Sequence, residues 1–174
     1  MGVYVDATDE LRWYALYTAS RAEKKVSERF TQEGIDHYLP LQRVKRRWSD
    51  RVKEVEIPVI NGYIFVHIPV ADSRKVTSIY GAIAFVSENG RPIAIRDKQL
   101  EVLRFMVEHA QEPVEYIQVS YERGEPIRIT KGPLEGMLGE LVEMQGKHKI
   151  LVRLEQFGCA ITEVPIFFIE KVGV

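Results

Sequence analysis

The sequence of 174 residues contains a single cysteine, Cys159, and so cannot form an internal disulfide. This excludes the small secreted domains that disulfides stabilise, and it fits a protein of the reducing cytoplasm. Long hydrophobic runs are also missing, because the densest one, residues 166–169, is far shorter than the roughly 20 apolar residues of a membrane-spanning helix. Residues 1–10 lack the basic and apolar segments of a secretion signal. We therefore expect a soluble, cytoplasmic protein with no membrane partner and a disordered leader over residues 1–11.

Motifs of common catalytic and nucleotide-binding sites are absent as well. The sequence has no Walker loop, no Gly-x-Ser-x-Gly elbow, no His-Glu-x-x-His and no Cys-x-x-Cys. Its four histidines are scattered along the chain. We therefore expect no enzymatic activity, no cofactor and no bound metal.

An excess of charge of one sign is also missing. The net charge is −1, and residues 1–110 carry +2 while residues 111–174 carry −3. Neither part is a polycation that would bind nucleic acid through its bulk charge, so any such contact has to come from a local cluster. The content of 45% hydrophobic and 28% charged residues is typical of a globular chain.

Residues 12–110 alternate between β-prone and helical segments, which predicts an α/β sandwich. A hairpin is expected over residues 41–57. The expected strands cover residues 13–18, 35–39, 60–68 and 82–86. The expected helices cover residues 21–33, 71–80 and 98–109. Ser20 and Glu23 have the spacing of a capping box at the start of the first helix.

The C-terminal part of the chain has no helical pattern. Residues 111–120 show little periodicity and are expected to be a linker. Short β-prone segments separated by glycine turns follow in residues 121–174, which predicts a small β-barrel. These segments cover residues 127–129, 138–144, 150–154, 160–164 and 166–169.

The predicted hairpin concentrates positive charge. Asp50 is the only acid among six bases in eleven residues, which are Arg43, Lys45, Arg46, Arg47, Arg51 and Lys53. In an extended strand the first, third and fifth positions of such a run share one face. A ribbon with this stripe can lie against phosphates, and Trp48 at its tip can stack on an unpaired base. The alternative is a solvated hairpin whose charges protect its edges.

Two other segments combine unlike faces. Arg21, Lys25 and Arg29 recur every four residues and predict a basic ridge on the first helix, although an ordinary amphipathic helix has the same pattern. In residues 63–68, period two places Tyr63, Phe65 and His67 on one face and aliphatic residues on the other. The aliphatic face belongs to the core. The aromatic face is either an exposed docking patch or a second face covered by helices.

These segments together resemble the NusG family of transcription elongation factors. The resemblance covers nearly all of residues 12–172 and rests on WYALYT at 13–18, YLP at 38–40 and NGYIFVHI at 61–68. GEPIRI at 124–129 with KGPLEGMLG at 131–139 is similar to the KOW motif. It implies an α+β fold: an N-terminal NGN-type α/β sandwich over residues 12–110, with an antiparallel sheet and flanking helices, and an SH3-like KOW β-barrel over residues 121–174.

The resemblance also implies partners and site residues for a non-enzymatic, monomeric factor. Family members bind the clamp helices of RNA polymerase, and the residues implied for this contact are Tyr17, Tyr63, Phe65 and Phe85. Contact with the opposite wall of the polymerase channel is implied for Asp72, Ser73, Arg74 and Lys75. Members also contact upstream or non-template DNA, and the resemblance implies this contact for Lys25 and Arg29. With Arg21 of the same ridge and the hairpin bases Arg43, Lys45, Arg46, Arg47 and Arg51, they make up the predicted nucleic-acid-binding residues. Phe157 matches the KOW loop that binds a small-subunit ribosomal protein or the Rho terminator.

Two departures from the general family pattern bear on which type of family member this chain resembles. The strand at 61–68 begins with Asn61 where the family pattern has proline, and Cys159 stands where the arginine after Phe-Gly is usual. The chain therefore looks more like the specialised RfaH and UpxY types, which act as antiterminators on particular operons. The alternatives are a general NusG-type elongation factor and an RNA- or ribosome-binding KOW module.

Overall fold

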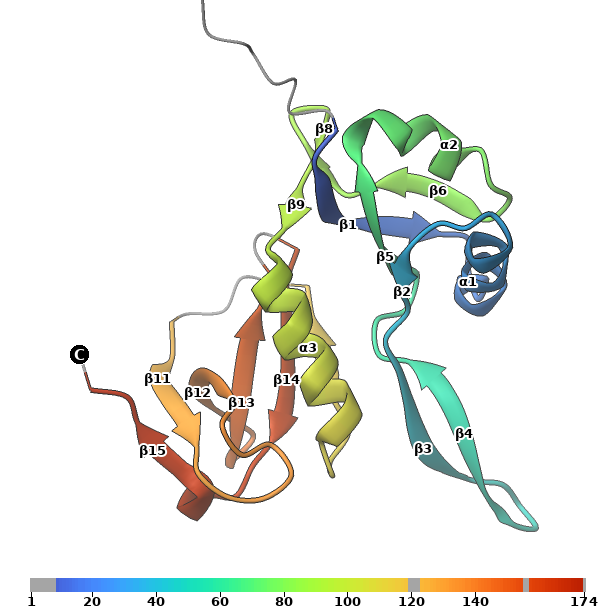
Figure 1. The fold of residues 1–174 in the computed structure, drawn as a ribbon. Coiled ribbons are helices and arrows are strands. Elements are labelled where there is room, and N and C mark those ends of the chain that lie inside the picture. The colour runs from blue at the N-terminus through green and yellow to red at the C-terminus, as the bar shows by residue number, and fades with distance from the viewer. Residues whose placement is uncertain (1–8, 119–122, 155–156, 174) are drawn as a thin grey trace, which may run out of the picture. The chain divides into compact units, whose positions relative to one another are not determined.

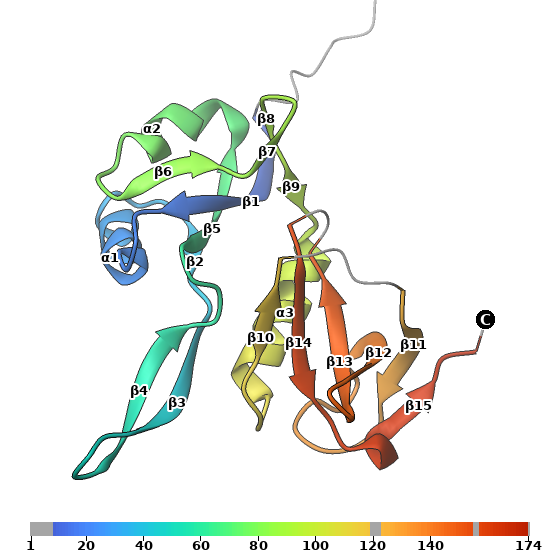
Figure 2. The same cartoon turned by 180° about the vertical axis from the view of Figure 1, so that it is seen from behind.

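The structure is a computed structural model that describes residues 9–118, 123–154 and 157–173. Residues 1–8 of the predicted leader lie outside the described residues, and Leu11, its last residue, already belongs to the first strand. The chain divides into two compact units, one formed by residues 1–39 with 61–97 and the other by residues 40–60 with 98–174. Figures 1 and 2 together label the strands and α-helices of both.

The first unit is built on an antiparallel sheet. Its longest strand, β1 (Leu11–Thr18), lies between β5 (Tyr63–Pro69) and β6 (Ala82–Phe85), with β2 (His37–Tyr38) on the other edge of β5. β9 (Ala94–Ile95) also pairs with β1, and β7 (Ser87–Glu88) and β8 (Arg91–Pro92) form a small hairpin of their own. The strands expected at 13–18, 60–68 and 82–86 are confirmed, and the one expected at 35–39 is reduced to β2.

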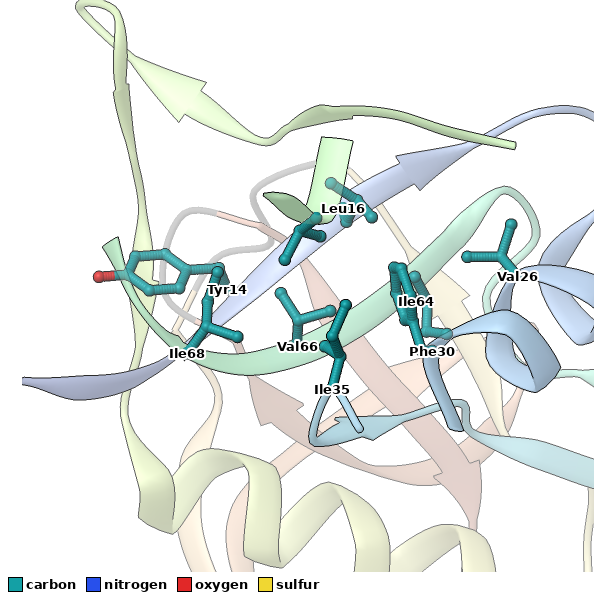
Figure 3. Close-up of a cluster of buried hydrophobic side chains, with 9 residues drawn as sticks. Tyr14, Leu16, Val26, Phe30, Ile35, Ile64, Val66 and Ile68 are labelled. Atoms are coloured by element: carbon teal, nitrogen blue, oxygen red, sulfur yellow. The ribbon is translucent and has the colours of Figure 1, made fainter. Parts of the chain in front are cut away.

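The core of this unit lies between one face of the sheet and the helices α1 (Glu23–Gln32) and α2 (Ser73–Thr77), which follows the short 3-10 helix η1 (Val70–Asp72). Val26 and Phe30, four residues apart on α1, are fully buried in the same cluster as Leu16 and Ile64 of the sheet (Figure 3). Apolar residues at helical spacing on α1 and at period two on β5 thus meet in one layer, as the sequence pattern predicts.

The capping box predicted at the start of α1 is wrong. The helix begins at Glu23, its N-cap is Ala22, and no side chain caps it. Instead Glu23 is buried, and its Oε1 accepts a hydrogen bond from the backbone N–H of Gly62, at 2.7 Å. Gly62 has a φ of +79°, a conformation that glycine adopts readily, and its carbonyl accepts a hydrogen bond from the N–H of Thr18. Glu23 therefore joins α1 to the start of β5.

The second unit contains the predicted hairpin and the last helix. β3 (Leu41–Arg47) and β4 (Val52–Pro58) form a two-stranded ribbon, visible in Figures 1 and 2. The turn between them is closed by the N–H of Trp48, which donates to the carbonyl of Arg51 at 2.7 Å. The helix α3 (Asp97–His109) buries one apolar side, made by Leu100, Leu103 and Met106.

The remaining strands form a six-stranded antiparallel sheet. Their order is β10 (Glu115–Ile117), β14 (Cys159–Glu163), β13 (Lys147–Arg153), β12 (Leu138–Met144), β11 (Glu125–Ile129) and β15 (Ile169–Lys171). The five predicted segments are present, although residues 166–168 form the 3-10 helix η2 (Ile166–Phe168) before β15. β10 lies inside the predicted linker and pairs with β14. The predicted α+β class, an N-terminal sheet with helices and a β-rich C-terminal part, is confirmed.

Two further features concern the described residues only. No helix there has the length and apolar content to cross a membrane. Within the same ranges, no group of three or more histidine, cysteine, aspartate or glutamate side chains is arranged to hold a metal ion.

Candidate functional surfaces

The sheet of the first unit has an aromatic face opposite its aliphatic core. In the register of β1 and β5, Tyr17 lies opposite Tyr63, Ala15 opposite Phe65 and Trp13 opposite His67. Residues opposite each other in an antiparallel pair point to the same side. The rings contact one another along this face. Trp13 stacks on His67 with ring centroids 4.7 Å apart, and the ring centroids of Tyr17 and Tyr63 are also 4.7 Å apart. The predicted division of β5 into two unlike faces is confirmed.

Exposure varies along this face, which the sequence left as either an exposed docking patch or a face covered by helices. Phe65 is fully buried and Tyr63 is only 8% exposed, whereas Tyr17 is 37% exposed. Phe65 lies on β5 between β1 and β2, where Tyr38 is opposite it and stacks on it at 6.3 Å. When a strand has a neighbour on each side, the side chains opposite a ring on those neighbours shield it from solvent. The accessible end of the aromatic face is therefore at Tyr17.

Phe85 does not belong to this face. It lies opposite Leu16 in the pairing of β1 with β6 and makes an edge contact with Tyr14 of the core, with centroids 6.0 Å apart. The residue opposite Tyr17 is Ala84, which is exposed. The structure thus brings together Tyr17, Tyr63 and Phe65 but not Phe85. The alternation along β6 could have revealed this from the sequence: neighbouring residues of a strand point to opposite sides, so Ala84 and Phe85 lie on different faces.

Tyr17 and Tyr63 lie side by side at the end of the face. Burial, followed by a hydrogen bond and an electrostatic interaction with Tyr17, raises the pKa of Tyr63 to about 12. The phenol of Tyr63 thus stays protonated far above neutral pH. We name this surface, made by Tyr17, Tyr63 and Ala84, the tyrosine edge. It offers two aromatic rings, one methyl group and two hydroxyl groups.

The charged segment at residues 72–75 spans the end of η1 and the start of α2. Asp72, Arg74 and Lys75 are exposed. Ser73 is half-buried, and its hydroxyl donates to the carbonyl of Val70, which fixes the turn between the two helices. The segment thus presents three charged side chains on a short, backbone-anchored turn.

The basic ridge predicted on the first helix is wrong as a ridge. Arg21 precedes α1 and has a φ of +57°, so it is not in register with the helix. Lys25 is exposed. The Nη1 of Arg29 donates to the carbonyl of Tyr80 at 2.7 Å, and its guanidinium carbon lies 5.0 Å from the centre of the Tyr80 ring. Arg29 is thus engaged within the first unit.

The charge of the basic hairpin differs between its base and its tip. Near the base, Arg43 lies opposite Glu56 and Lys45 opposite Glu54. Toward the tip, Arg46 lies opposite Lys53 and Arg47 opposite Val52. The single stripe of positive charge predicted from the sequence is therefore balanced by acids over its first half.

Phe157, for which the resemblance implies a partner contact, is largely buried. Its side chain is only 5% exposed. Tyr116 of β10 stacks on it with centroids 5.1 Å apart, and the Tyr116 hydroxyl donates to the Phe157 carbonyl at 2.6 Å. The sequence prediction treated residues 111–120 as a linker and so had no partner for this ring.

Comparisons with known proteins agree on one family. Residues 11–104 match the model of the family described as transcription termination factor NusG. The transcription termination/antitermination protein NusG of Rickettsia conorii is 25% identical over 161 residues, which are 86% of this chain and 83% of that protein. Its namesake from Staphylococcus carnosus is 26% identical over 159 residues, or 84% of this chain and 87% of the relative.

A solved structure described as the domain interaction in Thermotoga maritima NusG has the same fold. The two superpose with a TM-score of 0.55 and 20% identity over 94% of this chain and 98% of that one. Because the family model spans more than half of the sequence, this chain belongs to the NusG family of transcription termination and antitermination factors.

Proposed function

We propose that this protein is a specialised antitermination factor that binds the clamp helices of elongating RNA polymerase and suppresses pausing on particular operons. The observation that carries the proposal is the tyrosine edge, where Tyr17 is accessible beside the buried ring of Tyr63. Tyrosine is a frequent anchor of protein interfaces, because it offers a large apolar area and a hydroxyl. Two polymerase helices would pack against this edge of the sheet.

The charged turn at residues 72–75 extends the proposed contact. Asp72, Arg74 and Lys75 are exposed together, which suits a polar contact with the opposite wall of the polymerase channel. A factor that bridges two walls favours the conformation in which both are in reach. A preference of about 1.4 kcal/mol for the elongating state shifts its population roughly tenfold.

Retention of RNA polymerase by the immobilised protein tests the docking surface. We expect Tyr17→Ala to lose most of the bound polymerase. Tyr80→Ala is the matched control, because Tyr80 is 82% exposed and contacts α1 on the helix-covered side of the sheet. Equal retention by Tyr17→Ala and wild type would refute the tyrosine edge as the docking site. Phe65 is unsuitable for this test, since its ring is fully buried and its loss would damage the fold.

A general elongation factor is the second candidate, and the names of the relatives, termination/antitermination proteins, favour it. Sequencing of nascent transcripts after deletion of the gene separates the two. A specialised factor alters a few operons, and a general factor alters transcription broadly. Altered expression of most genes would therefore contradict the specialised role and leave the polymerase contact standing.

A further inference from the structure

The hairpin of β3 and β4 has two halves with different chemistry. Its base is attached to the rest of the second unit: the Gln42 amide donates to the carbonyl of Val114 and accepts from its N–H, both at 2.9 Å. Val44 and Val55 lie opposite each other and are half-buried. The tip has no such attachment among the described residues.

Charge follows the same division. At the base, the register sets Arg43 against Glu56 and Lys45 against Glu54, and unlike charges directly opposite each other stabilise a ribbon. At the tip, Arg46 is opposite Lys53, and like charges in that position destabilise it. All four basic side chains of the tip are exposed: Arg46, Arg47, Arg51 and Lys53. Within the described part of the chain, none of the four has an ion-pair partner.

Exposed apolar surface accompanies these charges. Trp48 is 54% exposed and Val52 is 63% exposed. The turn is fixed by the hydrogen bond from Trp48 to Arg51, so the indole is carried on an ordered loop among the cations. A flat aromatic side chain beside several unpaired cations is the arrangement that binds single-stranded nucleic acid.

We infer that the tip of the hairpin is a binding site for single-stranded nucleic acid, with Trp48 stacked on a base and Arg46 and Lys53 on the neighbouring phosphates. A phosphate next to Arg46 and Lys53 would relieve their mutual repulsion, whereas the base of the hairpin already has its acids in place. This inference rests on the proposed function only for its setting, the unpaired strand of a transcribing complex.

Titration of the full-length protein with labelled oligomers of about ten nucleotides tests the inference without polymerase. Oligothymidylate and oligouridylate distinguish DNA from RNA, and a duplex of the same length is the third arm. We expect a single strand to bind more tightly than the duplex and to quench the fluorescence of Trp48. The other tryptophan, Trp13, is 9% exposed and stacked on His67, so quenching that disappears in Trp48→Phe is assigned to the tip.

Substitutions separate stacking from charge. Because stacking on one aromatic side chain corresponds to a roughly 5- to 150-fold gain in affinity, we expect about 10-fold weaker binding for Trp48→Ala and near wild-type binding for Trp48→Phe. Loss of two phosphate contacts in the double variant Arg46→Gln with Lys53→Gln should reduce the slope of log affinity against log salt by about 1.4. The control, Arg43→Gln with Lys45→Gln, makes the same change in net charge and should leave that slope unchanged.

Several outcomes would overturn the inference. One is tighter binding of the duplex with no effect of Trp48→Ala, which would indicate a site for phosphates alone. Another is an equal loss in the two double variants, which would indicate a diffuse charge effect. A third is the absence of binding at low salt. None of these results bears on the retention of polymerase through Tyr17, so failure of the tip site and failure of the proposed function are distinguishable.

Discussion

Replacement of Glu23 by alanine should destabilise the first unit strongly, although the residue lies in the first turn of a helix at the surface of the sheet. Its carboxylate is buried and accepts the N–H of Gly62 at 2.7 Å. A hydrogen bond to a charged group contributes about 1.5–3 kcal/mol, and a negative charge at a helix N-terminus adds about 0.3–1 kcal/mol. We therefore expect Glu23→Ala to lower the free energy of unfolding by about 2–4 kcal/mol.

Ser20 provides the contrasting variant. If the capping box suggested by the sequence existed, Ser20→Ala would cost about 1 kcal/mol. In the structure the N-cap is Ala22 and no side chain caps the helix, and Ser20 is exposed. We expect Ser20→Ala to stay within about 0.5 kcal/mol of wild type. Glu23→Gln keeps an acceptor oxygen for Gly62 and loses the charge, so it should lie between the two.

Urea unfolding followed by tryptophan fluorescence measures these differences. The chain has two tryptophans, and a Trp48→Phe background leaves Trp13 of β1 as the only reporter, so the signal follows the first unit alone. With a urea dependence of about 1–3 kcal/mol per molar, the Glu23→Ala midpoint should fall by roughly 1–2 M. A Ser20→Ala midpoint as low as that of Glu23→Ala would refute the reasoning, because it would indicate that Ser20 caps the helix after all.

Two other outcomes follow from local geometry. A Cβ at Gly139 would lie 2.6 Å from Cγ1 of Ile150 and 2.9 Å from a backbone oxygen, so Gly139→Ala should cost about 1–3 kcal/mol; Gly173→Ala, in open space, is the control, and equal thermal midpoints would contradict the close packing. Because the pKa of Tyr63 is raised from 10 to about 12, its contribution is complete below pH 10 and is lost as the pH rises to 12. That loss approaches about 2–3 kcal/mol in alkaline unfolding curves, and it should vanish in Tyr63→Phe.

Much of the fold follows from local patterns in the sequence. Period two in residues 63–68 predicts two unlike faces of β5, and Val26 and Phe30, four residues apart, predict the buried side of α1. The hairpin and the five C-terminal segments are likewise set by β-prone runs between turn residues. The 3-10 helix at residues 166–168 escaped prediction, because an apolar run of three or four residues has no periodicity of its own.

The candidate sites depended far more on contacts that are distant in the sequence. Arg29 is bound to Tyr80, 51 positions away, and Phe157 is covered by Tyr116, 41 positions away. No local pattern encodes either pair. For the same reason the sequence left open whether Tyr63 and Phe65 are exposed, since period two shows which face a ring is on but not what lies next to it.

The sequence by itself determined the family, the two unlike faces of the central strand and the presence of a basic hairpin, because each of these is written in neighbouring residues. Only the tertiary structure decided which of those residues remain available to a partner. Strand register set Phe85 on the aliphatic face and placed acids opposite Arg43 but a second cation opposite Arg46. Register is fixed when strands and turns assemble around a common core, and a shift by one residue would reverse every such assignment.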